Sequence, residues 1–196
     1  MRRQRSWGYS LIELIFVIGL VATLSGFAIP LLLTGLDNLR AAGAARYMSA
    51  RLHRARMEAV VRSRDVAIQF TATSRGYTFA MYADGNRNGV LTRDIQRGID
   101  QPLGQPERLG DNFAGVEFGA VDALPPVDPG GTAPGSDPIR IGTSGLLTFT
   151  PLGTSSSGTL YIVGRHNAQY AVRILGTTGR IRVLKYEPGS RQWKPL

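Results

Sequence analysis

The chain has 196 residues, of which 43% are hydrophobic, and this is enough for one folded domain with its own core plus an anchor. Its formal net charge is +9, and it contains no Cys, which excludes a disulfide framework and thiolate chemistry. His53 and His166 are the only histidines, and no nucleophile elbow, phosphate loop or dinucleotide fingerprint is present. We therefore predict no enzyme and no organic cofactor.

The N-terminal region combines a basic segment, a small residue and a long apolar run. Arg2, Arg3 and Arg5 precede Gly8, and no charged residue occurs from Leu14 to Leu36. About 20 apolar residues let a helix cross a bilayer, so residues 9–36 predict a membrane-spanning helix. A secretory signal peptide is cut after its apolar run, whereas Gly8 lies before it. The hydrophobic helix is therefore expected to stay on the mature protein.

Two residues are unusual in such a helix. Glu13 would place a carboxylate at the edge of the lipid, where a charge is costly and usually functional. Pro30 lacks a backbone N–H, which predicts a kink or a local opening. The basic leader predicts a cytoplasmic N-terminus with the rest of the chain outside, although the Arg residues between 36 and 65 argue in the opposite direction.

Gly8 followed by Tyr9-Ser10-Leu11-Ile12-Glu13-Leu14 resembles the class III leader of type IV pilins and pseudopilins. The resemblance implies that prepilin peptidase cleaves after Gly8, removing residues 1–8, and that the new amino group of Tyr9 is methylated. It also implies that Glu13 pairs with the amino group of a neighbouring subunit in a filament. Such pairing spares an apolar bundle two isolated charges. The implied location is the inner membrane, with the C-terminal domain in the periplasm.

Residues 37–65 predict an amphipathic continuation of this helix. Apolar and small residues recur at spacings of three and four along one stripe, which we expect a sheet to cover. The stripe consists of Leu36, Leu39, Gly43, Tyr47, Ala50, His53, Met57 and Val60. His53 is therefore expected to be a packed core or boundary residue, and the Arg residues off the stripe are expected to form a solvated face.

Residues 55–66 are similar to the helix end of the type II secretion protein H and FimT group of pseudopilins. Residues 148–163 resemble the late hairpin of that family, and the Gly-, Pro- and Asp-rich stretch 98–138 predicts a long surface loop. Alternating apolar residues predict strands at 66–71, 77–82, 139–141, 146–149, 158–163, 169–175 and 180–186. The expected fold is α/β (α+β) and pilin-like, with a long N-terminal helix packed on an antiparallel β-sheet in a domain spanning 66–196.

The segment 84–94 has two interpretations. Asp84, Asn86 and Asn88 alternate before Gly89, as in the opening of a calcium loop, but the twelfth position is not an acid, and Asp94 lies one residue early. Asn, Asp and Gly are also the common residues of turns. The sequence favours a plain turn and leaves a calcium site with Asp84, Asn86, Asn88 and Asp94 as the alternative.

The C-terminal segment is strongly basic. Gly179-Arg180-Ile181-Arg182 resembles the Gly-Arg-x-Arg motif of DNA-binding FimT-type pilins. Arg180 and Arg182 alternate on a predicted strand, Lys185 follows, and Trp193 could stack on a base. Clustered cations bind phosphate without reading sequence, so DNA is a possible partner. The alternative is a solvated basic strand with no partner.

Three hypotheses for the function follow from these features. The resemblance favours a minor pseudopilin of a type II secretion system, whose partners are the other pseudopilins. A minor pilin that helps to assemble a type IV pilus would share the anchor, the fold and the assembly residue Glu13, with Pro30 at the expected depth. A DNA receptor for uptake would use the basic C-terminal segment.

Overall fold

The computed structural model describes residues 8–142 and 144–196 and divides into two compact units, residues 1–36 and 37–196. Helix α1 (Leu11–Arg62) supplies the described part of the first unit except residues 8–10, and it also supplies the first element of the second. It is unbroken at Pro30, so the predicted local opening is wrong. The hydroxyl of Thr34 donates to the carbonyl oxygen of Pro30 at 3.0 Å, within this continuous helix.

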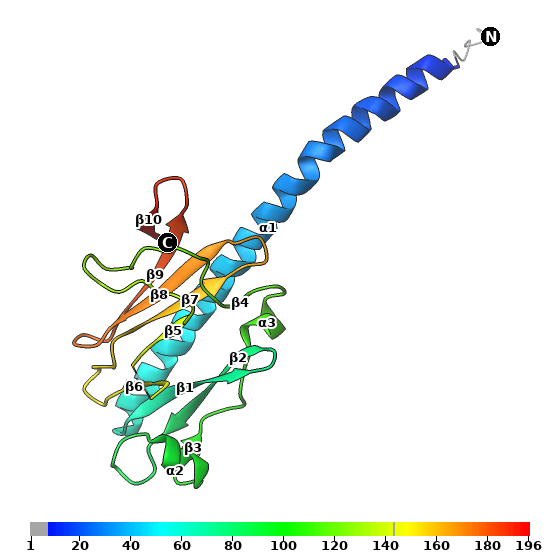
Figure 1. Cartoon of the computed structure of the whole chain (residues 1–196). Helices are drawn as coiled ribbons and strands as arrows, with labels where there is room; N and C mark the ends of the chain where they lie inside the picture. The colour runs from blue at the N-terminus through cyan, green and yellow to red at the C-terminus, as the bar shows by residue number, and fades with distance from the viewer. Residues whose placement is uncertain (1–7, 143) are drawn as a thin grey trace, which may run out of the picture. The chain divides into compact units, whose positions relative to one another are not determined.

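The second unit combines its part of α1 with two antiparallel sheets (Figure 1). The first sheet has the order β3-β2-β1-β6, and the second has the order β10-β9-β8-β7-β4, with β5 also paired to β7. The first sheet comprises β1 (Val66–Thr73), β2 (Gly76–Ala83), β3 (Gln101–Pro102) and β6 (Leu146–Phe149). The second comprises β4 (Glu117–Phe118), β5 (Ile139–Arg140), β7 (Gly158–Val163), β8 (Gln169–Leu175), β9 (Arg180–Glu187) and β10 (Gln192–Pro195).

The α+β pilin-like architecture is confirmed, but its strands are paired differently from the expectation. The β1–β2 hairpin forms as predicted, with Val66 opposite Ala83 and Thr73 opposite Gly76. The predicted late hairpin is wrong, because β6 pairs with β1 and β7 pairs with β8. The strands β6 and β7 therefore carry the chain from one sheet to the other.

The buried face of α1 differs from the predicted stripe. In the second unit α1 buries a face made mostly of alanines, which let the helix lie close to the strands. The buried residues are Asp37, Ala41, Ala42, Ala44, Ala45, Met48, Leu52, Ala55 and Ala59. Leu39 and Met57 are exposed, at 70% and 60%, and His53 is exposed as well. The prediction of a packed His53 is therefore wrong.

The second sheet is covered on both faces. Tyr170, Val172 and Ile174 of β8 belong to the main core, which they share with α1 and the first sheet. Ala171, between them, belongs to a second cluster, with Leu124, Tyr161 and Leu184 fully or almost fully buried in it. Alternate residues of a strand point to opposite faces, so this second cluster lies on the outer face of the sheet, opposite α1.

The stretch 98–138 is more than a surface loop. One short helix, α2 (Thr92–Gln96), ends just before this stretch, and another, α3 (Leu109–Asn112), lies within it. Leu109, Val116, Phe118 and Leu124 are all buried, and the first three belong to the main core. The prediction of a purely superficial loop is wrong, because these isolated apolar side chains each reach one of the two clusters.

Candidate assembly and binding surfaces

The predicted processing site lies at the start of the described residues. Gly8 and Tyr9 are exposed and precede α1, and Tyr9 is 86% exposed. No other atom lies near the position that a Cβ of Gly8 would occupy. Arg2, Arg3 and Arg5 of the basic leader lie outside the described residues. The Gly8–Tyr9 bond is therefore in extended or irregular backbone that an external protease could reach.

Glu13 lies in the first turn of α1. The backbone N–H of Glu13 donates to the hydroxyl of Ser10 at 3.2 Å, so Ser10 caps the start of the helix. Among the described residues, the Glu13 carboxylate forms no ion pair. Glu13 thus combines exposure, a fixed position at the helix start and a carboxylate that no described residue pairs with.

The apolar residues that follow Glu13 are exposed throughout the first unit. A window of α1 has a mean hydropathy of 2.4 and no buried residues, and α1 is long and apolar enough to span a membrane. The exposed large side chains include Phe16 (70%), Leu24 (61%), Phe27 (74%) and Leu31 (75%). So much exposed apolar surface marks a membrane or protein contact.

Asp37, the first residue of the second unit, holds the turn between β7 and β8. It is 4% exposed, and its two carboxylate oxygens accept the backbone N–H groups of Arg165 and His166, each at 2.8 Å. Gly164 packs so closely that a Cβ there would lie 2.5 Å from the carboxylate. The hydroxyl of Tyr170 donates nearby to the carbonyl oxygen of Asn38 at 3.3 Å. Nothing in the sequence pattern marked Asp37 as a buried acid.

The loop from Asp84 to Asp100 brings its predicted ligands together. The carboxylate of Asp84 accepts backbone N–H groups of Asn86, Arg87 and Gly89 at 2.8–3.0 Å. Asp94 accepts the side-chain amide of Asn88 at 3.0 Å, and the Asn86 amide lies at 3.5 Å from the same oxygen.

A third buried acid, Asp100, completes this loop and was missed by the sequence reasoning. It accepts backbone N–H groups of Gly85 and Leu91 at 3.0 and 2.9 Å. Across residues 8–142 and 144–196, no three acidic or His side chains are grouped as ligands for a metal ion. The carboxylates serve as hydrogen-bond acceptors for the turn, and calcium binding stays a prediction.

The four residues proposed to contact DNA lie on two faces of the second sheet. Arg180 and Arg182 share the outer face of β9 with Leu184, which belongs to the outer cluster. Lys185 lies on the opposite face, with Ile181 and Val183, which pack on the main core. Arg180 is exposed, and within the described residues neither Arg180 nor Arg182 forms an ion pair.

Trp193 has a packing role that the sequence did not reveal. Its indole N–H donates to the carbonyl oxygen of Pro125 at 3.0 Å. Its ring lies 5.2 Å from the ring of Tyr186 and 5.9 Å from that of Tyr161, centroid to centroid. These contacts hold Trp193, which is half-buried, against the outer cluster, and stacking of Trp193 on a base stays a prediction.

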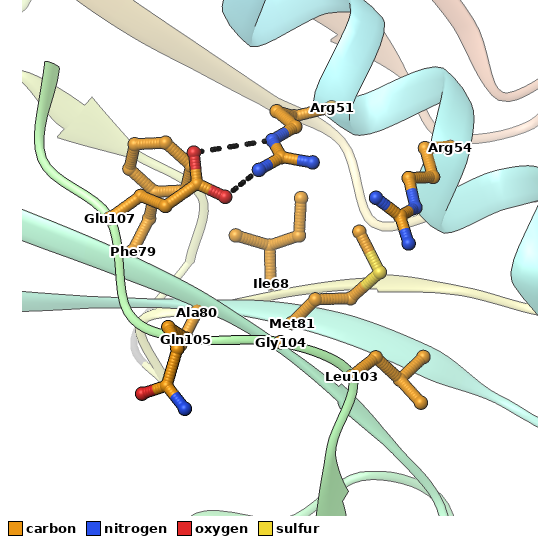
Figure 2. A pocket seen from close by; sticks show the side chains of 10 residues that line it. All are labelled: Arg51, Arg54, Ile68, Phe79, Ala80, Met81, Leu103, Gly104, Gln105 and Glu107. Atoms are coloured by element: carbon orange, nitrogen blue, oxygen red, sulfur yellow. Dashed lines mark hydrogen bonds and ion pairs between the residues drawn. The ribbon is translucent and has the colours of Figure 1, made fainter. Parts of the chain in front are cut away.

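A cavity of about 330 Å³ lies between α1 and the first sheet (Figure 2). Arg51 of α1 forms an ion pair with Glu107, and the hydroxyl of Tyr47 donates to the same carboxylate. Ile68, Phe79 and Met81 supply apolar wall, and Arg54 extends from the helix beside them (Figure 2). This network ties the segment after β3 to the helix and was missed, because no local pattern pairs Arg51 with an acid 56 residues away.

Both histidines lie at the surface of the second unit. His53 lies on the exposed face of α1, and His166 lies in the turn after β7. In the part of the chain that the structure describes, neither forms an ion pair with a carboxylate. Their surroundings resemble those of ordinary surface residues.

A long apolar N-terminal helix continuing into a globular α+β unit defines the class of pilin-like proteins. Residues 44–179 match the model of the family described as type II transport protein GspH. The chain belongs to the GspH family, a family of structural pseudopilins.

One relative agrees with this class. The chain is 31% identical over 162 residues to the pilin-like protein PilA1 of Thermus thermophilus, covering 80% of this chain and 91% of that protein. Two structures of the minor pseudopilin EpsH of the Vibrio cholerae type II secretion system each match 74% of this chain at 15% identity. They cover 97% and 92% of the EpsH chains, with TM-scores of 0.46 and 0.43.

Proposed function

We propose that this chain is a minor pseudopilin, a structural subunit of the pseudopilus of a type II secretion system. The observation that carries the proposal is the exposed apolar half of α1, which begins with the exposed acid Glu13 just after Gly8 and Tyr9. Membership of the GspH family supports the secretion system as the machine.

The assembly chemistry follows from the placement of these residues. Prepilin peptidase cleaves after Gly8 and leaves the amino group of Tyr9, which is then methylated. Before assembly the apolar half of α1 spans the inner membrane, with the globular unit in the periplasm. In the filament Glu13 of one subunit pairs with the amino group of Tyr9 in its neighbour. This pair sets the axial register, as a lone polar group does in a coiled coil.

The substitution Glu13→Ala tests this role directly. Glu13→Ala should be cleaved and inserted normally, but it should recover the other pilin-like subunits poorly when it is affinity-purified from crosslinked cells. Glu117→Ala is the matched control, because Glu117 is exposed and forms no ion pair within the described residues. Normal recovery of the partner subunits with Glu13→Ala would contradict the assembly role.

A second candidate function is that of a minor type IV pilin that binds DNA during uptake. The exposed Arg180 and the half-buried Arg182, on one face of β9 and without a carboxylate partner among the described residues, favour it. The resemblance to a protein named pilin-like is compatible with either machine. Neighbouring genes for secretion components or for pilus components would separate the two functions.

A further inference from the structure

A second cavity lies on the outer face of the second sheet, at some distance in the sequence from every residue discussed for assembly. Its volume is about 470 Å³, and its polar lining includes Thr159 and Tyr161 of β7, Arg140 of β5, Arg173 of β8, Asp128 and Asp137. We call it the Tyr161 cavity. The segment from Pro126 to Thr132 supplies part of the opposite wall. The cavity therefore lies between a rigid sheet and a Gly- and Pro-rich segment.

The strand register explains why these side chains meet. Thr159 lies directly opposite Arg140 on one side and Arg173 on the other. Residues directly opposite each other in antiparallel strands point to the same face, so the three form a row across β5, β7 and β8. Tyr161, two residues after Thr159, points to the same face.

Two hydroxyl groups in this cavity, on side chains that are otherwise buried, form no hydrogen bond with the described residues. Tyr161 is 1% exposed and Thr159 is 7% exposed. Among the described residues, neither hydroxyl makes a hydrogen bond, and neither oxygen is sealed from solvent as that of Ser155 is. Because Thr159 and Tyr161 both line the cavity, each hydroxyl group is free to donate to and accept from a ligand that displaces solvent there.

Protein acceptors satisfy only some of the N–H groups of Arg140 and Arg173. Arg173 donates through Nε to Asp128 at 2.6 Å and through Nη1 to the carbonyl oxygens of Gly158 and Ile174. Arg140 donates through Nη1 to the carbonyl oxygens of Ala133 and Pro134, each at 3.2 Å. These bonds tie the covering segment to the sheet at two places, and the Nη2 group of each arginine makes none of them.

The charges of the lining balance. Arg140 and Arg173 are matched by Asp128 and Asp137, and one oxygen of Asp137 accepts the backbone N–H of Ile139 at 3.0 Å. Burial raises the pKa of Tyr161, while Arg140 and Arg173 oppose that shift and Asp128 adds to it. The phenol therefore lies within the field of both arginines and stays a neutral donor and acceptor at physiological pH.

We propose that the Tyr161 cavity binds a neutral, polyhydroxylated ligand of about the size of a disaccharide. A sugar hydroxyl both donates and accepts, so it matches a lining in which guanidinium donors, carboxylate acceptors and hydroxyl groups alternate. The balanced charge gives no strong preference for a free anion or cation. The volume falls in the range of about 300–1,000 Å³ that is usual for small-molecule sites.

Calorimetric titration of the full chain tests the proposal. The protein is held in a zwitterionic detergent, because alkyl glycoside detergents carry the sugar that the cavity is expected to bind. The probes are maltose, cellobiose and N,N′-diacetylchitobiose, with sodium acetate and sodium phosphate as anion probes. At least one disaccharide should bind, and Tyr161→Phe, which removes only the hydroxyl, should weaken that binding roughly 3–10-fold.

Two further variants make the result specific. Tyr186→Phe is the matched control, because Tyr186 lies on the same face beside Trp193 but does not line the cavity, and it should leave affinity unchanged. Thr159→Val keeps the shape of the side chain and should also weaken binding, which preserves the test if Tyr161→Phe fails to fold. Binding of amylose or cellulose in a pull-down would identify a polymer as the source of the sugar.

Three results would overturn the proposal. The first is that none of the disaccharides binds, which would mean that solvent alone satisfies the two hydroxyl groups. The second is binding that Tyr161→Phe and Thr159→Val leave unchanged, which would place the sugar elsewhere. The third is that only acetate or phosphate binds, which would identify the cavity as an anion site built on Arg140 and Arg173.

Discussion

Removing the carboxylate of Asp37 should cost the globular unit a large part of its stability. Asp37→Ala deletes two hydrogen bonds from an ionised acceptor to the backbone N–H groups of Arg165 and His166. Each hydrogen bond to a charged group contributes about 1.5–3 kcal/mol, so the loss should be about 3 kcal/mol or more. Asp37→Asn keeps one acceptor oxygen and should lose about half as much.

Urea unfolding of the full chain measures this difference. Trp193 lies in the outer cluster, so its fluorescence reports the globular unit once Trp7 has been replaced by Phe. The midpoint temperature of thermal unfolding should be lower in Asp37→Ala than in the wild type by roughly 6–12 °C. Asp122→Ala is the control, because Asp122 is exposed and has no ion pair within the described residues, and it should change stability by less than about 0.5 kcal/mol.

Gly164 provides a second test of the same contact. A Cβ at position 164 would lie 2.5 Å from the Asp37 carboxylate, so Gly164→Ala should destabilise the wild-type chain. In the Asp37→Ala background the obstructing carboxylate is gone, and Gly164→Ala should cost less than about 1 kcal/mol. Additive effects of the two substitutions, or a change below about 0.5 kcal/mol for Asp37→Ala, would refute the reasoning.

Three other predictions concern processing, DNA and pH. Gly8→Asp should leave the precursor uncut in the membrane. Mass spectrometry of the wild-type protein should find a methylated N-terminus at Tyr9. An intact Met1 terminus on the wild-type protein, in cells with active peptidase, would count against this prediction. If the basic strand binds DNA, the double substitution Arg180→Ala, Arg182→Ala should weaken binding to every DNA sequence. It should also reduce the slope of log affinity against log salt concentration by roughly one unit per lost contact, as measured by fluorescence anisotropy. Unchanged binding would remove the DNA hypothesis. Burial, and then the neighbouring Asp84, raise the pKa of Asp65, so ionisation of Asp65 costs stability once the pH rises above the ordinary Asp value. Asp65→Asn should therefore be more stable than the wild type at neutral pH and should lose this advantage in acid. Equal urea midpoints for the variant and the wild type at both pH values would contradict this prediction.

The parts of the fold that depend on local pattern could be predicted from the sequence. The strands β1 and β2 alternate clearly, and β2 begins directly after the turn with Gly76, which has a φ of +97°. Arg180 and Arg182 share a face because they are two residues apart on one strand. These features require no knowledge of what the rest of the chain does.

The predictions that failed concern features that depend on side-chain size or on partners distant in the sequence. The buried face of α1 consists largely of alanines, which carry a weak hydrophobic signal, while the larger Leu39 and Met57 on the exposed face dominate the periodicity. The pairing of β6 with β1 joins segments about 80 residues apart, and no turn signal between neighbours reports it. Arg51 and Glu107 meet for the same non-local reason.

The candidate site divides in the same way. Gly8, Tyr9 and Glu13 are close in sequence at fixed spacing, so a short motif identifies them. Asp37 and the Tyr161 cavity combine residues from separate strands and turns, and only the register of β5, β7 and β8 brings Arg140, Thr159 and Arg173 into one row. A sequence motif could not have shown this row.

The cover over the outer face of the second sheet limits where this chain can change in length. Leu124 and the Pro125 carbonyl oxygen hold the outer cluster together, so a deletion there would uncover Leu184 and Trp193 and would make the globular unit prone to aggregate. Residues 129–133, in contrast, are exposed. A peptide epitope inserted between Gly130 and Gly131 should leave the outer cluster folded, although it alters one wall of the Tyr161 cavity, and it would allow the subunit to be labelled and counted within an assembled filament.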